Sequence, residues 1–148
     1  MFGSSEFSST FFVNKSQSEA MLMVIESLKQ LSMRVVRVDT TNGVILGKVS
    51  SSLKSMGEDL TIQMEKKEEG TLIVIHSQCN YPGQKIDWGK NEKNVNRITD
   101  TLSTFQDKEY PDAETSLIAI TDQINSKSNE SGCLTIVIGI FVALGFFL

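Results

Sequence analysis

Residues 34–49 read RVVRVDTTNGVILGKV, and this stretch decides the fold of the chain. Two runs rich in β-branched residues, Arg34–Asp39 and Val44–Val49, flank an Asn-Gly pair at positions 42 and 43. Asn and Gly adopt the left-handed backbone that a tight hairpin turn requires, and β-branched side chains suit a pleated strand. The stretch therefore predicts two antiparallel strands.

The sequence on both sides of this hairpin predicts further strands. Residues 58–66 alternate between apolar and polar side chains, as in a strand with one buried face. Residues 71–78 (TLIVIHSQ) are apolar on both faces, which is typical of a central strand. Residues 10–14 (TFFVN) predict a short first strand, whose place in the sheet the pattern does not give. Glu58 and Asp59 are expected to begin their strand and to stay solvated.

Two helices complete the predicted domain. Ser16 and Glu19 form an S-x-x-E capping box before apolar residues at helical spacing, which predicts a helix over residues 17–31. Asn91 is the expected N-cap of a second helix, whose apolar stripe includes Val95 and Ile98. The predicted order is β-α-β-β-β-β-α. It indicates an α+β fold, with a mostly antiparallel sheet of about five strands and both helices on one face.

Composition divides the chain into four segments. The Ser-rich residues 1–9 are expected to be disordered, and residues 10–108 to form the α+β domain. Residues 109–132 predict an acidic linker, in which Pro111 and the helical spacing of Leu117, Ile120 and Ile124 allow a short helix, either docked on the domain or lying at the level of the lipid headgroups. The whole net charge of −4 lies in residues 109–131, so the domain itself is neutral. A neutral domain has no basic stripe for phosphates, which argues against binding to nucleic acid.

Residues 133–148 (CLTIVIGIFVALGFFL) carry no charge and predict a transmembrane helix. At 1.5 Å per residue they span about 24 Å, against a hydrocarbon core of about 30 Å. Either a thinner bilayer makes up the difference, or the natural chain continues past Leu148. Residues 1–16 lack the features of a signal peptide. The sequence therefore predicts a single-pass tail anchor in the lipid bilayer, with the domain in the cytoplasm.

Side chains that often carry catalysis are few. The one histidine, His76, stands three residues before Cys79, and residues three apart on a strand point to opposite faces. The other cysteine, Cys133, lies at the expected membrane border, so no disulfide is predicted. One histidine and one cysteine in the domain do not suffice for a zinc site. We therefore expect no catalytic residues, no metal and no cofactor, and a protein that is not an enzyme.

The loop YPGQKIDWGKN, residues 81–91, is the most distinctive segment of the domain. Its Trp88 is the only tryptophan of the chain, and Asp87, Lys90 and Asn91 surround it in the sequence. In one interpretation Trp88 is an exposed anchor for a protein partner or a ligand, and these four residues are the candidate site. In the other, Trp88 folds back over the end of the sheet, Asp87 or Asn91 caps the second helix, and Gly89 adopts a positive φ.

The motif DWGKN at residues 87–91, together with the capping box and the Asn-Gly hairpin, resembles small uncharacterised bacterial proteins. In those proteins a compact α+β domain precedes one or more hydrophobic segments. The similarity covers about residues 10–106. It implies the same fold and a place at a bacterial membrane, and it transfers no functional residues.

Two functions fit these expectations. The first is a membrane-tethered, non-enzymatic interaction module in the cytoplasm. Its docking surface is either the Trp88 loop or the sheet face opposite the helices, which carries Arg34, Thr61, Gln63 and Glu65. The alternative is a domain that binds a small apolar ligand or a lipid between sheet and helices. Five methionines can line an adaptable cavity there, namely Met21, Met23, Met33, Met56 and Met64.

Overall fold

The computed structural model describes residues 5–50, 57–81, 83 and 89–129. The transmembrane helix predicted for residues 133–148 lies outside these ranges. Within them, no helix combines the length and the apolar character needed to cross a membrane.

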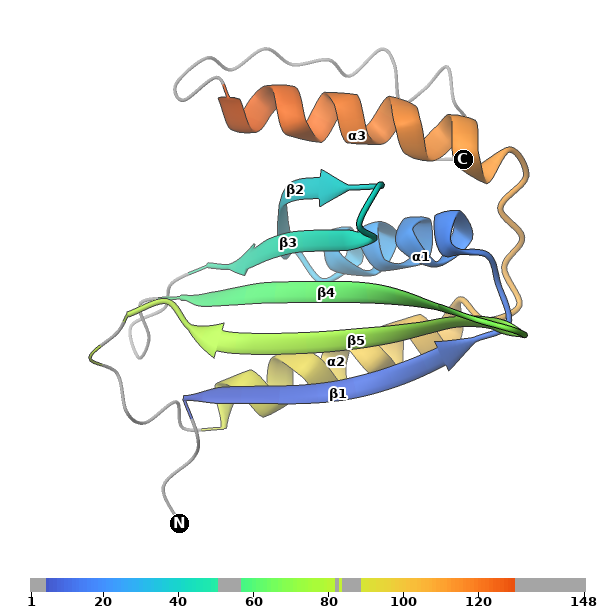
Figure 1. The fold of residues 1–148 in the computed structure, drawn as a ribbon. Coiled ribbons are helices and arrows are strands. Elements are labelled where there is room, and N and C mark those ends of the chain that lie inside the picture. The colour runs from blue at the N-terminus through green and yellow to red at the C-terminus, as the bar shows by residue number, and fades with distance from the viewer. Residues whose placement is uncertain (1–4, 51–56, 82, 84–88, 130–148) are drawn as a thin grey trace.

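Five antiparallel strands form a single sheet in the order β1-β5-β4-β3-β2 (Figure 1). This result confirms the predicted α+β class and the predicted order of the elements. The first strand, which the sequence did not place, pairs with the last one at one edge of the sheet. The elements are β1 (Glu6–Val13), α1 (Gln17–Gln30), β2 (Arg34–Asp39), β3 (Val44–Val49), β4 (Glu58–Lys67), β5 (Gly70–Cys79), α2 (Lys90–Thr104) and α3 (Ala113–Asn129).

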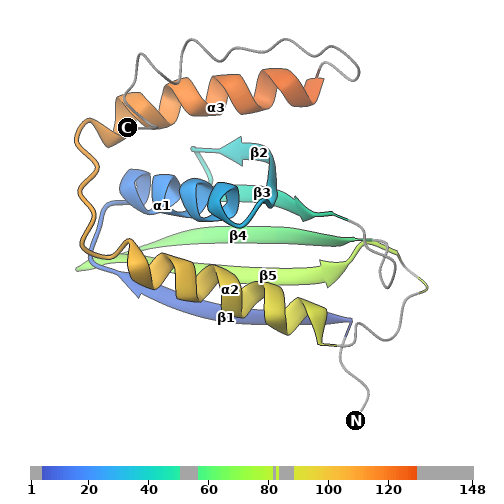
Figure 2. The ribbon, with the colours of Figure 1, turned by 180° about the vertical axis from the view of Figure 1, so that it is seen from behind.

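The helices α1 and α2 cover one face of the sheet, and α3 runs beside β2 and α1 (Figures 1 and 2). The helix α1 is central, because it contacts α2 on one side, α3 on the other and four of the five strands. It begins with the predicted capping box. Glu19 N–H donates to Ser16 Oγ at 3.3 Å, and Ser16 N–H donates to Glu19 Oε2 at 3.0 Å.

The hydrophobic core lies between this helical layer and the sheet. Alternate residues of the strands, among them Ile45, Ile62 and Ile75, point toward the helices and are fully buried. They meet apolar residues of α1 on successive turns, and Val95, Ile98 and Leu102 of α2. The predicted alternation of residues 58–66 is therefore confirmed, with one exception: Glu58 is buried rather than solvated.

The strand β1 begins earlier than the sequence predicted. Residues 6–9, which were expected to be disordered, belong to it and pair with β5 from Glu6 opposite Gln78 onward. Phe7, Ser9 and Phe11 point toward the helices there, with both phenylalanines against the core, whereas Ser8 and Thr10 point away. The Ser-rich composition concealed this alternation.

The helix α2 also begins differently. Its N-cap is Gly89, with a φ of +76°, so the positive φ expected for this glycine is confirmed. Asn91 is not the N-cap. It lies inside the first turn, and its side chain is buried against the sheet.

Residues 113–129 form the helix α3, so the helix that the sequence allowed in this segment is present, and it packs on the domain against β2 and α1. Its buried residues Leu117, Ile120 and Gln123 lie on one face, while Glu114 and Asp122 are exposed. The described domain therefore extends to residue 129.

The connection between α2 and α3 is held against α1 by Glu26. The hydroxyl of Tyr110 donates to Glu26 Oε2 at 2.9 Å, and the ammonium of Lys108 pairs with Glu26 Oε1. Burial, and the hydrogen bond to Glu26, raise the pKa of Tyr110 above its ordinary value. The phenol therefore remains a hydrogen-bond donor throughout the neutral range.

The side chain of Asn125 joins α3 to β2. Its Oδ1 accepts a hydrogen bond from Val38 N–H at 3.0 Å, and its Nδ2 donates to Val38 C=O at 2.9 Å. The amide thus hydrogen-bonds both the backbone N–H and the backbone C=O that Val38 presents on the outer side of β2. One asparagine fixes the position of the helix along the strand.

We predict that Asn125→Ala lowers the free energy of unfolding by about 1–3 kcal/mol, because Val38 loses the partners of its N–H and C=O. Urea denaturation of the full chain measures this loss. In the control, Asn129→Ala changes an exposed residue of the same helix and should shift stability by less than about 0.5 kcal/mol. Equal denaturation midpoints for the two variants would contradict the proposed role of Asn125.

Candidate functional site

Polar side chains gather between the sheet and the first turns of α2, in a part of the interface that is otherwise apolar. We call this group the polar cluster; its members are Glu58, Ser77, Cys79, Asn91 and Asn94. Four of them are buried, and Cys79 is half-buried.

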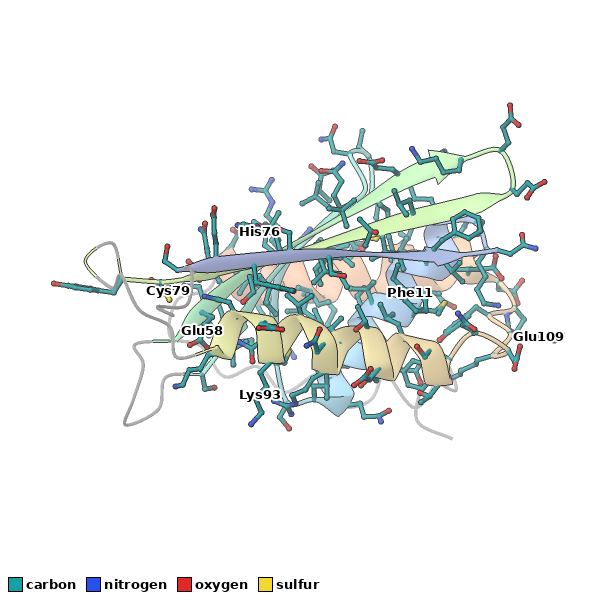
Figure 3. All side chains as sticks on the ribbon, turned by 90° about the horizontal axis from the view of Figure 1, so that it is seen from below. Phe11, Glu58, His76, Cys79, Lys93 and Glu109 are labelled. Atoms are coloured by element: carbon teal, nitrogen blue, oxygen red, sulfur yellow. The ribbon has the colours of Figure 1, made fainter. Side chains whose placement is uncertain are left out.

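The sheet register explains why these residues meet. Glu58 pairs with Cys79, and Leu60 pairs with Ser77, so Glu58, Ser77 and Cys79 all point toward the helices. Asn91 and Asn94 are three residues apart on α2 and share the face that looks back at them. Figure 3 shows Glu58 and Cys79 at the end of the sheet where α2 begins.

Asn91 is the centre of the polar cluster and is 0% exposed. Its Oδ1 accepts a hydrogen bond from Ser77 Oγ at 2.7 Å. Its Nδ2 donates to the carbonyl of Ser5 at 2.8 Å and lies 3.5 Å from Cys79 Sγ. One amide thereby joins α2 to β5 and to the residue that precedes β1.

Glu58 is only 3% exposed. Its Oε2 accepts a hydrogen bond from Asn94 Nδ2 at a long 3.4 Å. Its Oε1 has no hydrogen-bond partner among the described residues. Within these residues, the only other buried side-chain oxygen without a hydrogen-bond partner is Thr121 Oγ1. Burying an oxygen without a hydrogen bond costs about 1–3 kcal/mol, so the presence of a carboxyl group at this position requires an explanation.

The predicted site residues fall into two groups. Asp87 and Trp88 lie outside the described residues. Lys90 is half-buried at the start of α2, and the neighbouring Asn91 belongs to the polar cluster. The predicted site and the polar cluster therefore share Asn91, but the sequence did not connect Asn91 with Glu58, which lies far away in the chain.

His76 and Cys79 point to opposite faces of the sheet, as their spacing predicted (Figure 3). His76 instead meets Ser8 and Glu6 of β1. Its Nδ1 lies 2.6 Å from Ser8 Oγ, and its Nε2 lies 3.6 Å from Glu6 Oε2. The three residue types are those of a hydrolytic triad, but they lie on the sheet face away from the helices rather than in a cavity. A nucleophile needs a site that holds the reacting group beside it, so this trio does not define an active site.

The structure also has a groove that is separate from the polar cluster. An open groove of about 650 Å³ lies at the opposite end of the molecule, between the start of α1, the β4–β5 turn and the start of α3. Its lining includes both lysines and glutamates, so the groove has no single charge that would select a ligand. Among the described residues, no group of three His, Cys, Asp or Glu side chains could hold a metal ion.

Four of the five methionines expected around a cavity, namely Met21, Met23, Met33 and Met64, are buried in the core. The fifth, Met56, lies outside the described residues.

Comparison with solved structures finds the same fold in Ara h 8.0201, with a TM-score of 0.50 and 8% identity over 68% of this chain and 95% of that chain. The protein TTHA0849 from Thermus thermophilus gives 0.42 and 13%, over 78% of this chain and 99% of that one. The di-domain ARO/CYC StfQ from the steffimycin biosynthetic pathway gives 0.40 and 12%, over 83% and 52%. No family model and no curated protein matches the sequence. At these identities the likeness concerns the fold alone.

We predict that Asn91→Ala lowers the free energy of unfolding by about 2–3 kcal/mol, because Ser77 Oγ and the Ser5 carbonyl lose a buried partner. The matched control is Asn96→Ala, at an exposed position of the same helix, which should cost less than about 0.5 kcal/mol. Urea denaturation of the full chain compares the two variants. Similar losses for Asn91→Ala and Asn96→Ala would mean that the polar cluster does not hold α2 to the sheet.

Proposed function

We propose that this domain binds a small, largely apolar molecule between the sheet and α2, and that the carboxyl group of Glu58 makes the polar contact. One observation carries the proposal: Glu58 Oε1 is buried and has no partner among the described residues. A protein that binds nothing there gains stability by replacing this carboxyl with an apolar group. A ligand that donates a hydrogen bond to Oε1 removes the cost of burying it.

The surroundings indicate the chemistry of the ligand. Leu60, Val95 and Ile98 line the same side of the interface and are fully buried. Most of the ligand must therefore be apolar, with one hydroxyl, amine or amide N–H placed to reach Glu58. The fold supports the proposal only in its general form, because a sheet covered by helices on one face provides an interior between the two layers.

Flexible side chains can repack to form a cavity for such a ligand. Met21, Met23 and Met64 are buried in the same core, and the methionine thioether chain repacks at low cost. Ligand entry then requires adjustment of side chains, not separation of the two layers.

A saturable probe tests this function. N-phenyl-1-naphthylamine is apolar and carries one N–H donor, and its fluorescence rises on transfer from water to an apolar site. We expect Glu58→Met to weaken its binding about tenfold, which corresponds to the loss of one hydrogen bond of about 1.4 kcal/mol. The same variant should unfold at a higher temperature than the wild type, because removal of the unsatisfied Oε1 outweighs the loss of the long hydrogen bond from Asn94 Nδ2.

The control for this experiment is Glu65→Met on the same strand, whose side chain points away from the helices. It should leave the affinity for the probe unchanged. Weaker binding with lower stability would make Glu58 a structural residue. The absence of saturable binding to the wild-type chain would reject the proposed function.

We also propose that residues 133–148 anchor this domain to a membrane, as a single-pass protein with the domain in the cytoplasm. The support is the sequence of the segment, which is uncharged throughout and in which most residues are strongly apolar.

Exchanging Ile138 and Val142 for lysine should move the full chain from the carbonate-washed membrane pellet to the supernatant, since each lysine costs about 2.5–3.5 kcal/mol near the centre of a bilayer. Exchanging the same two residues for leucine is the control and should leave the chain in the pellet. Recovery of the wild-type chain in the supernatant would reject the anchor.

A further inference from the structure

The strand β1 forms one edge of the sheet, and among the described strands it pairs only with β5 (Figures 1 and 2). Cys79 N–H donates to Ser5 C=O at 2.9 Å, which fixes the side to which each residue of β1 turns its peptide groups. Because this direction alternates along a strand, the odd-numbered residues of 7–13 bond to β5, and the even-numbered residues of 6–12 turn their N–H and C=O outward. Among the described residues, no hydrogen bond reaches the outward peptide groups of Ser8, Thr10 and Phe12.

The two edges of the sheet differ in how well they are protected against a further strand. At the opposite edge, Asn125 occupies the N–H and C=O of Val38, and a bulge interrupts β2 between Val35 and Arg37. Within the described residues, β1 has neither a covering side chain nor a bulge. Its sequence, EFSSTFFV, includes no proline and no lysine, and its one charge is at Glu6, the first residue. Such an edge accepts the addition of a strand.

We propose that the added strand is β1 of a second copy of this chain, paired antiparallel about a twofold axis that passes through Ser9 perpendicular to the sheet. This register sets Ser8 of each copy opposite Thr10 of the other, and Phe12 opposite Glu6. Outward peptide groups therefore meet outward peptide groups, and each pair of Ser8 with Thr10 exchanges two hydrogen bonds. The two sheets continue as one.

The side chains of β1 favour its own copy as this partner. In the proposed register, Phe7 of each copy lies opposite Phe11 of the other, on the face toward the helices. Both phenylalanines pack against the core but are only partly buried. They belong to pairs without backbone hydrogen bonds, in which side chains approach most closely and aromatic residues stabilise each other. A second copy therefore covers the aromatic area that β1 leaves exposed at the border of the core.

The rest of the fold permits this dimer and limits it to two copies. The helix α2 contacts both β1 and β5, so its axis lies about half a strand spacing inside β1. The two copies of α2 are then two strand spacings apart, or about 10 Å, which is an ordinary distance between packed helices. Further growth of the sheet stops because Asn125 occupies the remaining edge of each copy.

The experiment places a cysteine on the proposed axis. Ser9 faces its own equivalent there, in a pair whose Cα atoms lie about 4.5 Å apart, within the range for a disulfide. Ser9→Cys in the full chain should therefore form a disulfide-linked dimer under mild oxidation. The wild-type chain gives the background from Cys79 and Cys133.

The control for the register is Thr10→Cys. Two copies of position 10 are offset by two residues along the strands, which separates their Cα atoms by about 8–9 Å, too far for a disulfide. This variant should give no more dimer than the wild-type background.

A second pair of variants tests the backbone hydrogen bonds. Thr10 N–H points outward, so Thr10→Pro removes a donor from the proposed interface and none from the pairing with β5. Added to Ser9→Cys, it should lower the dimer yield about tenfold, since twofold symmetry removes the bond twice. Thr10→Val keeps the N–H and should leave the yield unchanged.

Peptide mapping of the crosslinked product should find the bond between two copies of position 9. Three results would each overturn the proposal: equal dimer yields for cysteine at positions 9 and 10, equal yields for the proline and valine variants, or capture of a different protein at position 9. The comparison of positions 9 and 10 decides even if the proline variant does not fold.

Discussion

The burial of α1 is the interaction on which the rest of the structure depends. Eight of its fourteen residues are buried, because the sheet, α2 and α3 cover it on three sides. Few of its side chains remain available to water, so its apolar residues extend around most of the helix instead of forming a narrow stripe. Each neighbouring element is stabilised by apolar area that it shares with α1. A chain without this helix would leave the helix-covered face of the sheet exposed over β2, β3 and β4, because α2 covers only the side of β1 and β5.

The polar cluster lies between the sheet and the first turns of α2, at the border of the apolar core that surrounds α1. The contacts of α2 with the sheet are of two kinds, since its second half packs Ile98 and Leu102 into the core while its first half buries Asn91 and Asn94. Buried amides specify geometry more strictly than apolar contacts do, because their hydrogen bonds tolerate little displacement. The first turn of α2 is therefore positioned by polar bonds and the remainder by packing. Glu58 is the one member of the cluster whose bonding is incomplete, and this sets it apart as a candidate for contact with a ligand.

Local features of the sequence were sufficient to predict much of the fold. The Asn-Gly hairpin, the capping box and the alternation of β4 act within a few residues, and the structure confirms each of them. The features that the sequence did not reveal depend on distant partners. The order of the serines in β1 depends on pairing with β5, and the burial of Asn91 depends on its bonds to Ser77 and Ser5. The alternation of β4 places Glu58 on the inward face with Leu60 and Ile62, but it is the packing of α2 over this end of the sheet that buries the carboxyl group.

The contact between Asn125 and Val38 also bears on how this protein avoids self-assembly into fibrils. The outer strand of any sheet presents peptide groups on which a foreign extended segment can grow. The sequence of β2, RVVRVD, is rich in β-branched residues, and such segments readily nucleate cross-β structure once they are unprotected. The side chain of Asn125 occupies the position that an invading strand would need first. Cleavage of the chain between α2 and α3 would therefore do more than remove a helix, because loss of Asn125 would leave the peptide groups of β2 open to the addition of another strand.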